Sequence, residues 1–126
     1  MILVKQFYVN TTNGVDLIKV SHEVRQVVQS MKGDQGWVVV MAPSPGAGLV
    51  VMEATNEAGI HEGNLGLVCL LLPKSIIVPI EKKMMMMEPW QEIYLIDYET
   101  SGRRREFRVQ LFSESEPKEA NEPARQ

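Results

Sequence analysis

The sequence is poor in the residues that build disulfides and transition-metal sites. It has one cysteine, Cys69, and two histidines, His22 and His61. A single cysteine cannot form an intramolecular disulfide, so we expect a reduced cytoplasmic compartment, with Cys69 as a core side chain. A tetrahedral zinc site uses three or four suitably spaced ligands, which these two histidines do not supply. The sequence therefore predicts neither a disulfide nor a zinc site.

Long hydrophobic runs and an excess of positive charge are also missing. The longest apolar run, residues 65–73, has about half the length of a membrane-spanning helix. Residues 1–4 are apolar, but Lys5 follows them and no cleavage site completes a signal peptide. The net charge of −3 argues against a general nucleic-acid binder. We therefore expect neither a membrane nor a nucleic acid as partner.

The length and composition favour one folded domain followed by a tail. The chain has 126 residues, 44% of them hydrophobic, which is enough to bury a core. Residues 113–126 contain no large apolar side chain and several glutamates. We therefore expect a single domain over residues 1–112 and a disordered acidic tail over 113–126. Such a tail is also compatible with a partner-binding module.

Apolar segments separated by turn-forming residues predict an α+β fold, with a mixed, mostly antiparallel sheet and one or two short helices. The segment 36–42 is so apolar that it predicts a central strand covered on both faces. Thr100-Ser101-Gly102 is typical of a hairpin turn between the last two strands. The predicted strands are residues 2–9, 15–20, 36–42, 49–52, 67–72, 76–80, 91–98 and 105–112.

Periodicity indicates which side chains face the core. Ser21 is a plausible N-cap of a helix that ends at Gly33, and its core face is Val20, Val24, Val27, Val28 and Met31. In the last strand Phe107, Val109 and Leu111 share one face. In the strand before it, alternation predicts Ile93, Leu95 or Ile96, and Tyr98 inward, with Glu92, Tyr94 and Asp97 outward.

An ordered set of residues carries a resemblance to a known family. The run from Ser44 to Glu53 and the segment from Leu72 to Phe112 contain the matches, with Ser44 standing where the family motif has a histidine. In this order and spacing the chain resembles the YjbQ-like family, as a divergent, shortened member that lacks a polar segment with further histidines. The matching residues are Ala47, Leu49, Glu53, Leu72, Ser75, Pro79, Trp90, Gln91, Arg103 and Arg104.

The resemblance implies a homotrimer and, for some members, a weak thiamine-phosphate synthase activity. In that reaction a thiazole nitrogen attacks a methylene carbon and pyrophosphate leaves, so the leaving group needs a metal ion or arginine. By resemblance, Glu53 and Glu62 would be catalytic carboxylates able to hold Mg²⁺, and Arg103 and Arg104 would contact a phosphorylated small molecule or other anion. The rest of the site region would be Ser44, Asn56, His61, Trp90 and Gln91.

Two functions follow from this comparison. Because the family histidines are missing, the first hypothesis is a trimeric protein with a degenerate active site and a non-catalytic binding or structural role. The alternative is a surviving weak synthase. The two glutamates also fit a solvated polar loop, and the two arginines fit a solvated hairpin tip.

Two further segments have plain structural interpretations. Residues 43–48 (PSPGAG) are glycine-rich, but they lack the lysine of a phosphate loop and contain two prolines without backbone N–H groups, which favours a rigid turn. The four consecutive methionines from Met84 to Met87 predict a core or subunit interface. A copper(I) site is disfavoured because adjacent residues of an extended chain point to opposite faces.

Overall fold

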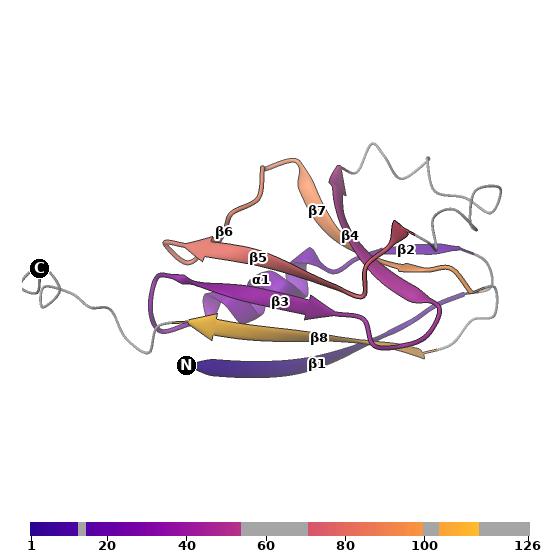
Figure 1. Cartoon of the computed structure of the whole chain (residues 1–126), viewed down its shortest axis with the longest axis horizontal. Helices are drawn as coiled ribbons and strands as arrows, with labels where there is room; N and C mark the ends of the chain where they lie inside the picture. The colour runs from indigo at the N-terminus through magenta and orange to yellow at the C-terminus, as the bar shows by residue number, and fades with distance from the viewer. Residues whose placement is uncertain (13–14, 54–70, 100–103, 114–126) are drawn as a thin grey trace, which may run out of the picture.

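Two antiparallel sheets and one helix form the protein in the computed structural model, which describes residues 1–12, 15–53, 71–99 and 104–113 (Figure 1). This arrangement confirms the predicted α+β class and the mostly antiparallel pairing. The elements are β1 (Ile2–Asn10), β2 (Asp16–Lys19), α1 (Ser21–Gln29), β3 (Gly36–Met41), β4 (Ala47–Glu53), β5 (Ser75–Glu81), β6 (Met84–Met85), β7 (Gln91–Asp97) and β8 (Arg104–Ser113).

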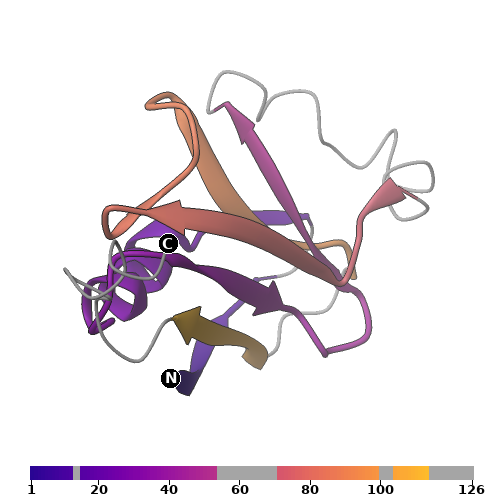
Figure 2. The same cartoon turned by 60° about the vertical axis from the view of Figure 1, so that its left-hand side comes forward.

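The larger sheet has the strand order β1-β8-β3-β5-β6, and the smaller one has the order β2-β7-β4. Helix α1 lies beside the larger sheet, and in Figure 2 the strands β4 and β7 run across the long strands β3 and β5. The first strand pairs with the last along its whole length, from Ile2 opposite Phe112 to Asn10 opposite Arg104. The N-terminal ammonium donates a hydrogen bond to the carbonyl oxygen of Ser113 at 2.7 Å.

The chain changes sheet where the sequence suggested a hairpin. Strand β7 pairs with β2 and β4, whereas β8 pairs with β1 and β3. The predicted hairpin between the last two strands is therefore wrong, and its turn, residues 100–102, lies outside the described residues. Similarly, the successive strands β1 and β2 belong to different sheets. Turn-forming residues mark where the chain reverses, but they do not say which strand it joins next.

The predicted core faces of the helix and of the last strand are confirmed. Every predicted core residue of the helix is at most 3% exposed, and the three residues of β8 are fully buried. They pack together with apolar side chains of β3, β4, β5 and β7 in one cluster. These core residues are Val20, Val24, Val27, Val28, Met31, Phe107, Val109 and Leu111.

The helix ends differ from the prediction. Ser21 is not an N-cap, because α1 begins at Ser21 itself and no side chain caps it. Its hydroxyl instead accepts a hydrogen bond from the Ile93 N–H at 2.7 Å, which ties α1 to β7. The helix ends at Gln29, with Ser30 as its C-cap, so Gly33 lies beyond the end rather than at it. The N-terminal end is thus held by a tertiary contact, whereas Ser30 closes the C-terminal end through local hydrogen bonds to Val27.

Two exposure predictions in the strands are wrong. Tyr94 and Asp97 were expected to face outward, but both are fully buried, like Ile93, Leu95 and Ile96, so both faces of β7 are covered. The strand at 36–42 was expected to be covered on both faces, yet Trp37 is 48% exposed. Strand β3 is central within its sheet, but within the described residues only one face of that sheet packs against the core.

The uncovered side of the larger sheet, which we call the outer face, is rich in apolar side chains. Ile2, Phe112, Trp37 and Pro79 are neighbours across four strands, and Trp37 stacks on Phe112 with 5.4 Å between ring centroids. The next row of the same face adds further apolar side chains. Ile2 and Ile77 are 68% and 66% exposed. The outer face is defined by Ile2, Val4, Trp37, Val39, Ile77, Pro79 and Phe112.

The methionine run alternates as an extended chain should. Met85 and Met87 pack against the core cluster, while Met84 and Met86 are 68% and 54% exposed. This confirms the core half of the prediction for that run. Within the described ranges no helix is long and apolar enough to cross a membrane. The predicted strand residues 67–70 and the tail residues 114–126 lie outside the described part.

Candidate functional site

The predicted site residues fall at two separate places in the chain. Glu53 and Gln91 are opposite each other where β4 ends and β7 begins. Ser44 precedes β4, and Arg104 opens β8 at the other end of the molecule. The seven residues of β4 place these two groups roughly 20 Å apart. Glu62, Asn56, His61 and Arg103 lie outside the described residues. Within one chain, the described candidates therefore do not form a single site.

The two predicted residues beside Glu53 are parts of a turn. The Gln91 side chain accepts a hydrogen bond from the Glu88 N–H at 2.8 Å, and the Gln91 N–H donates to the Glu88 carbonyl oxygen at 3.0 Å. Trp90 lies inside this turn with 58% of its surface exposed. Gln91 thus stabilises the turn that precedes β7, which is a structural role.

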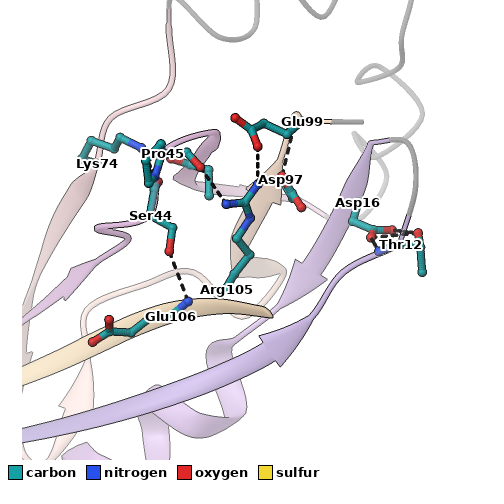
Figure 3. Close-up of polar contacts among 10 residues, drawn as sticks. Thr12, Asp16, Ser44, Pro45, Lys74, Asp97, Glu99, Arg105 and Glu106 are labelled. Atoms are coloured by element: carbon teal, nitrogen blue, oxygen red, sulfur yellow. Dashed lines mark hydrogen bonds and ion pairs between the residues drawn. The ribbon is translucent and has the colours of Figure 1, made fainter. Parts of the chain in front are cut away.

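At the opposite end, Arg105 forms the most heavily bonded charged cluster that the structure describes (Figure 3). Its guanidinium is 1% exposed and donates to the Asp97 carboxylate at 2.9 Å and to the Glu99 carboxylate at 3.1 Å. A third hydrogen bond goes to the Pro45 carbonyl oxygen at 2.8 Å. This side chain therefore joins strands β7 and β8 to the loop between β3 and β4.

The pKa values in this cluster follow from burial opposed by pairing. Burial by itself would raise the pKa of Asp97, but hydrogen bonds from Arg105 and Thr11 hold it below its usual value. Burial likewise opposes the charge of Arg105, yet the bonds to Asp97 and Glu99 raise its pKa. Both groups are thus held in their charged forms and paired with each other. The guanidinium is engaged within the fold rather than offered to a ligand.

The loop that carries Ser44 is held by its neighbours. Gly46 has a φ of +83°, and a Cβ added there would lie 2.2 Å from Cγ of Glu99, so only glycine fits. The Lys74 ammonium donates to the Ser44 and Ala47 carbonyl oxygens at 2.8 and 2.5 Å. Burial and the nearby charge of Arg105 lower the pKa of Lys74. The loop is a rigid turn, as residues 43–48 were interpreted.

Ser44 itself makes only a long contact. Its hydroxyl accepts a hydrogen bond from the Glu106 N–H at 3.4 Å (Figure 3). Nothing in the described structure provides a base for this hydroxyl. Arg104, the other predicted residue at this end, lies over the Tyr8 ring with 4.0 Å between its guanidinium carbon and the ring centroid. Neither residue is arranged for chemistry in a single chain.

Sequence reasoning missed Arg105, although the pattern contained a signal for it. Arg105 continues the alternation of Phe107, Val109 and Leu111, so it belongs to the buried face of β8. An arginine on a buried face needs carboxylate partners, and Asp97 and Glu99 precede it by only a few residues. Arg103 and Arg104 were singled out because they match the family pattern, and Arg105 was overlooked beside them.

A Mg²⁺ site does not fit the residues that the structure describes. A hard cation needs several oxygen ligands, usually from carboxylates. Among the described residues, no three His, Cys, Asp or Glu side chains gather at one point. Glu53 is the one predicted carboxylate ligand within the described ranges, since Glu62 lies outside them.

The fold is similar to that of several solved structures. A structural genomics target from C. acetobutylicum aligns with a TM-score of 0.77 at 22% identity, over 87% of this chain and 99% of that one. A YbjQ-like protein of unknown function from Sulfolobus solfataricus gives 0.76 at 18% identity, over 90% and 99%. An uncharacterised conserved protein of the YjbQ/UPF0047 family from Clostridium acetobutylicum gives 0.73 at 20%, over 86% and 99%.

At these identities the likeness establishes the fold alone. No protein-family model matches the sequence, and no curated protein matches it. The chain therefore has the fold of these neighbours, which agrees with the resemblance drawn from its sequence. A shared fold does not carry a shared reaction, so function has to be argued from the residues of this chain.

Proposed function

We propose, starting from this YjbQ-like fold, that the chain is a trimeric protein with a degenerate active site and a non-catalytic binding or structural role. One observation carries the proposal. The place of the motif histidine is taken by Ser44, and the buried cation beside its loop, Arg105, donates through its two Nη atoms to Asp97, Glu99 and Pro45. The charged groups at this end hold the loop in place. They are therefore not free to contact a substrate, as charged groups in a catalytic site must.

The geometry within one chain also supports a non-catalytic role. Pyrophosphate departure requires cations close to the leaving group, together with the carboxylates that hold a metal ion. Glu53 lies at the far end of β4 from Ser44 and Arg104, roughly 20 Å away along the strand. A single chain thus separates the groups that such chemistry would have to bring together.

Self-association is supported by the outer face. Exposed apolar side chains usually occur singly on a monomer, whereas contiguous groups of them mark interaction surfaces. Here one row of apolar side chains, with a stacked Trp37 and Phe112, extends over four strands, and the next row adds Val4, Val39 and Ile77, with Gln110 between Val4 and Val39. Aromatic side chains are enriched at the centres of protein interfaces. We assign the trimer contact to this face.

The trimer contact is tested by Trp37→Asp. Placing a charge at the centre of a desolvated apolar interface costs several kcal/mol, so we expect the 14.2 kDa single chain to replace the trimer in light-scattering measurements. Trp37 lies outside the core cluster, so the far-UV circular dichroism is expected to stay unchanged. The matched control is Lys19→Asp, at an exposed end of β2. A trimer that persists in Trp37→Asp contradicts the assignment.

The alternative function is a weak thiamine-phosphate synthase supported by Glu53, Glu62, Arg103 and Arg104 with Mg²⁺. The observation in its favour is the state of Glu53. Its carboxylate has no ion pair with any residue in the described ranges and is partly exposed at the end of β4. A second chain could bring cations to it that its own chain holds elsewhere.

The two functions are separated by an assay for thiamine phosphate from the two phosphorylated precursors with magnesium. We expect no product above background, because the charged groups are engaged in the fold. A YjbQ-like protein that keeps its histidines serves as the positive control. Product that is formed by the wild type and lost in Glu53→Ala would establish the synthase instead.

A further inference from the structure

A cavity between α1 and the β5–β6 hairpin is separate from both the predicted site residues and the outer face. Its volume is about 330 Å³, which is within the range of small-molecule pockets. The helix contributes Val28, which is 2% exposed and belongs to the core. The hairpin and the segment after it contribute Met84, Met85 and Met87. The floor is therefore apolar and built from side chains that adapt to different shapes.

The same cavity has a charged rim. Arg25 and Lys83 both line it, and Glu88 is the carboxylate that lines it with them. Arg25 is half-exposed, and its ion pair with Glu92 is long, at 3.8 Å. Lys83 forms no ion pair with any residue that the structure describes. The rim thus carries one net positive charge beside an apolar floor.

The two lysines at the rim form the turn of the β5–β6 hairpin. Lys82 and Lys83 have φ values of 54° and 64°, the pair of positive values that a two-residue type I′ turn requires between Glu81 and Met84. The Lys83 N–H donates to the Asp34 carbonyl oxygen at 3.0 Å, which fixes the hairpin against the loop after α1. The hairpin turn therefore holds Lys83 at a defined place on the rim.

We infer that this cavity binds a small amphipathic anion, an unbranched alkyl chain with one carboxylate group. The apolar chain packs on Val28, Met85 and Met87, and the carboxylate faces Arg25 and Lys83. A single negative charge matches the net charge of the rim, whereas a doubly charged head group would be repelled by Glu88. This site lies outside the set of residues considered for synthase chemistry and does not depend on the proposed function.

Calorimetric titration with octanoate tests the inference, with octan-1-ol and octyltrimethylammonium as ligands of equal chain length. Octanoate is expected to bind at least about tenfold more tightly than the alcohol, a difference of about 1.4 kcal/mol. The cation is expected not to bind. Equal affinities for octanoate and octan-1-ol would mean that the cavity is a nonspecific apolar surface that does not recognise the carboxylate, and would overturn the inference.

A matched pair of variants locates the site. Lys83→Gln removes a rim cation and is expected to weaken octanoate binding about tenfold, a loss of about 1.4 kcal/mol. Lys82→Gln changes the neighbouring lysine, which has the same backbone conformation but does not line the cavity. It is expected to leave binding unchanged. Equal losses of affinity in Lys83→Gln and Lys82→Gln would overturn the assignment, and so would a failure of octanoate to bind either the wild type or the Trp37→Asp variant. If octanoate binds Trp37→Asp but not the wild type, a second copy of the chain covers the cavity, and the assignment is wrong for the assembled protein.

Discussion

Replacing Arg105 with methionine is expected to lower the free energy of unfolding by about 3–5 kcal/mol. Methionine keeps much of the side-chain volume but removes the guanidinium that pairs with Asp97 and Glu99. Asp97 is fully buried, so its carboxylate is then left without its main cation. The loop at Pro45 also loses the hydrogen bond that holds it to β8. Urea denaturation measures the loss.

Arg104→Met is the matched control for that variant. Arg104 is the preceding residue in the same strand, but it is exposed, and its guanidinium lies over the face of the Tyr8 ring. An exposed cation–π contact contributes about 0.5–1 kcal/mol, so the control should lose little. Equal losses for the two variants would mean that the buried cluster contributes no more than a surface arginine.

The free energy of unfolding, measured as the pH is lowered, gives a second test of the same cluster. The pKa of Asp97 is lowered in the folded protein, so its ionised form contributes stability that is complete above the unfolded value of 3.8 and is lost as the pH falls below it. Without the guanidinium, burial is opposed only by the hydrogen bonds from Thr11 and the Glu99 N–H, so the pKa of Asp97 is higher than in the wild type. Protonation of Asp97 then costs Arg105→Met less stability than it costs the wild type, so the difference in stability between the two proteins is expected to narrow as the pH falls.

Phe107→Ala is expected to destabilise the fold by about 3–5 kcal/mol. Phe107 is fully buried in the core cluster and stacks on Phe7 with 5.0 Å between ring centroids. Truncation removes apolar contacts and leaves a cavity between the sheet and the helix. Because this residue lies inside a single chain, the loss should be the same at every protein concentration.

Phe112→Ala, five residues further along β8, separates core from surface effects. Phe112 lies on the outer face, stacked on Trp37. Losing an aromatic pair costs about 0.5–1.5 kcal/mol, and if the outer face is the proposed trimer contact, the loss should increase with protein concentration. Losses of equal size and equal concentration dependence for the two phenylalanines would contradict the division of β8 into a core face and an outer face.

The sequence predicted the positions of the helix and the strands better than it predicted which strands pair with each other. The helical valines and the alternating residues of β8 fixed the core, because period and burial are directly linked. Pairing was not accessible in the same way: Thr100-Ser101-Gly102 resembles a hairpin turn, yet the strands on either side join different sheets. That choice depends on contacts between distant segments, which local turn chemistry does not encode.

The candidate site was predictable only in part, for a similar reason. Resemblance pointed to Ser44, Glu53 and Arg104, but their separation follows from the length and direction of β4. The buried Arg105 was within reach of the alternation rule and was missed because neighbouring arginines matched a motif. Tyr94 and Asp97 were placed outward because an alternating strand was assumed to have one solvated face.

The pairing of the first strand with the last has a consequence for synthesis on the ribosome. Strand β1 is at the edge of its sheet and has β8 as its neighbour there. The nascent chain must therefore carry residues 2–10, with Leu3, Phe7 and Val9 still without their core contacts, until residues 104–113 have left the exit tunnel. At about 5–20 residues per second this delay lasts several seconds. During translation, β1 is made long before its partner β8, and in that interval its apolar side chains are the ones that chaperones would have to protect.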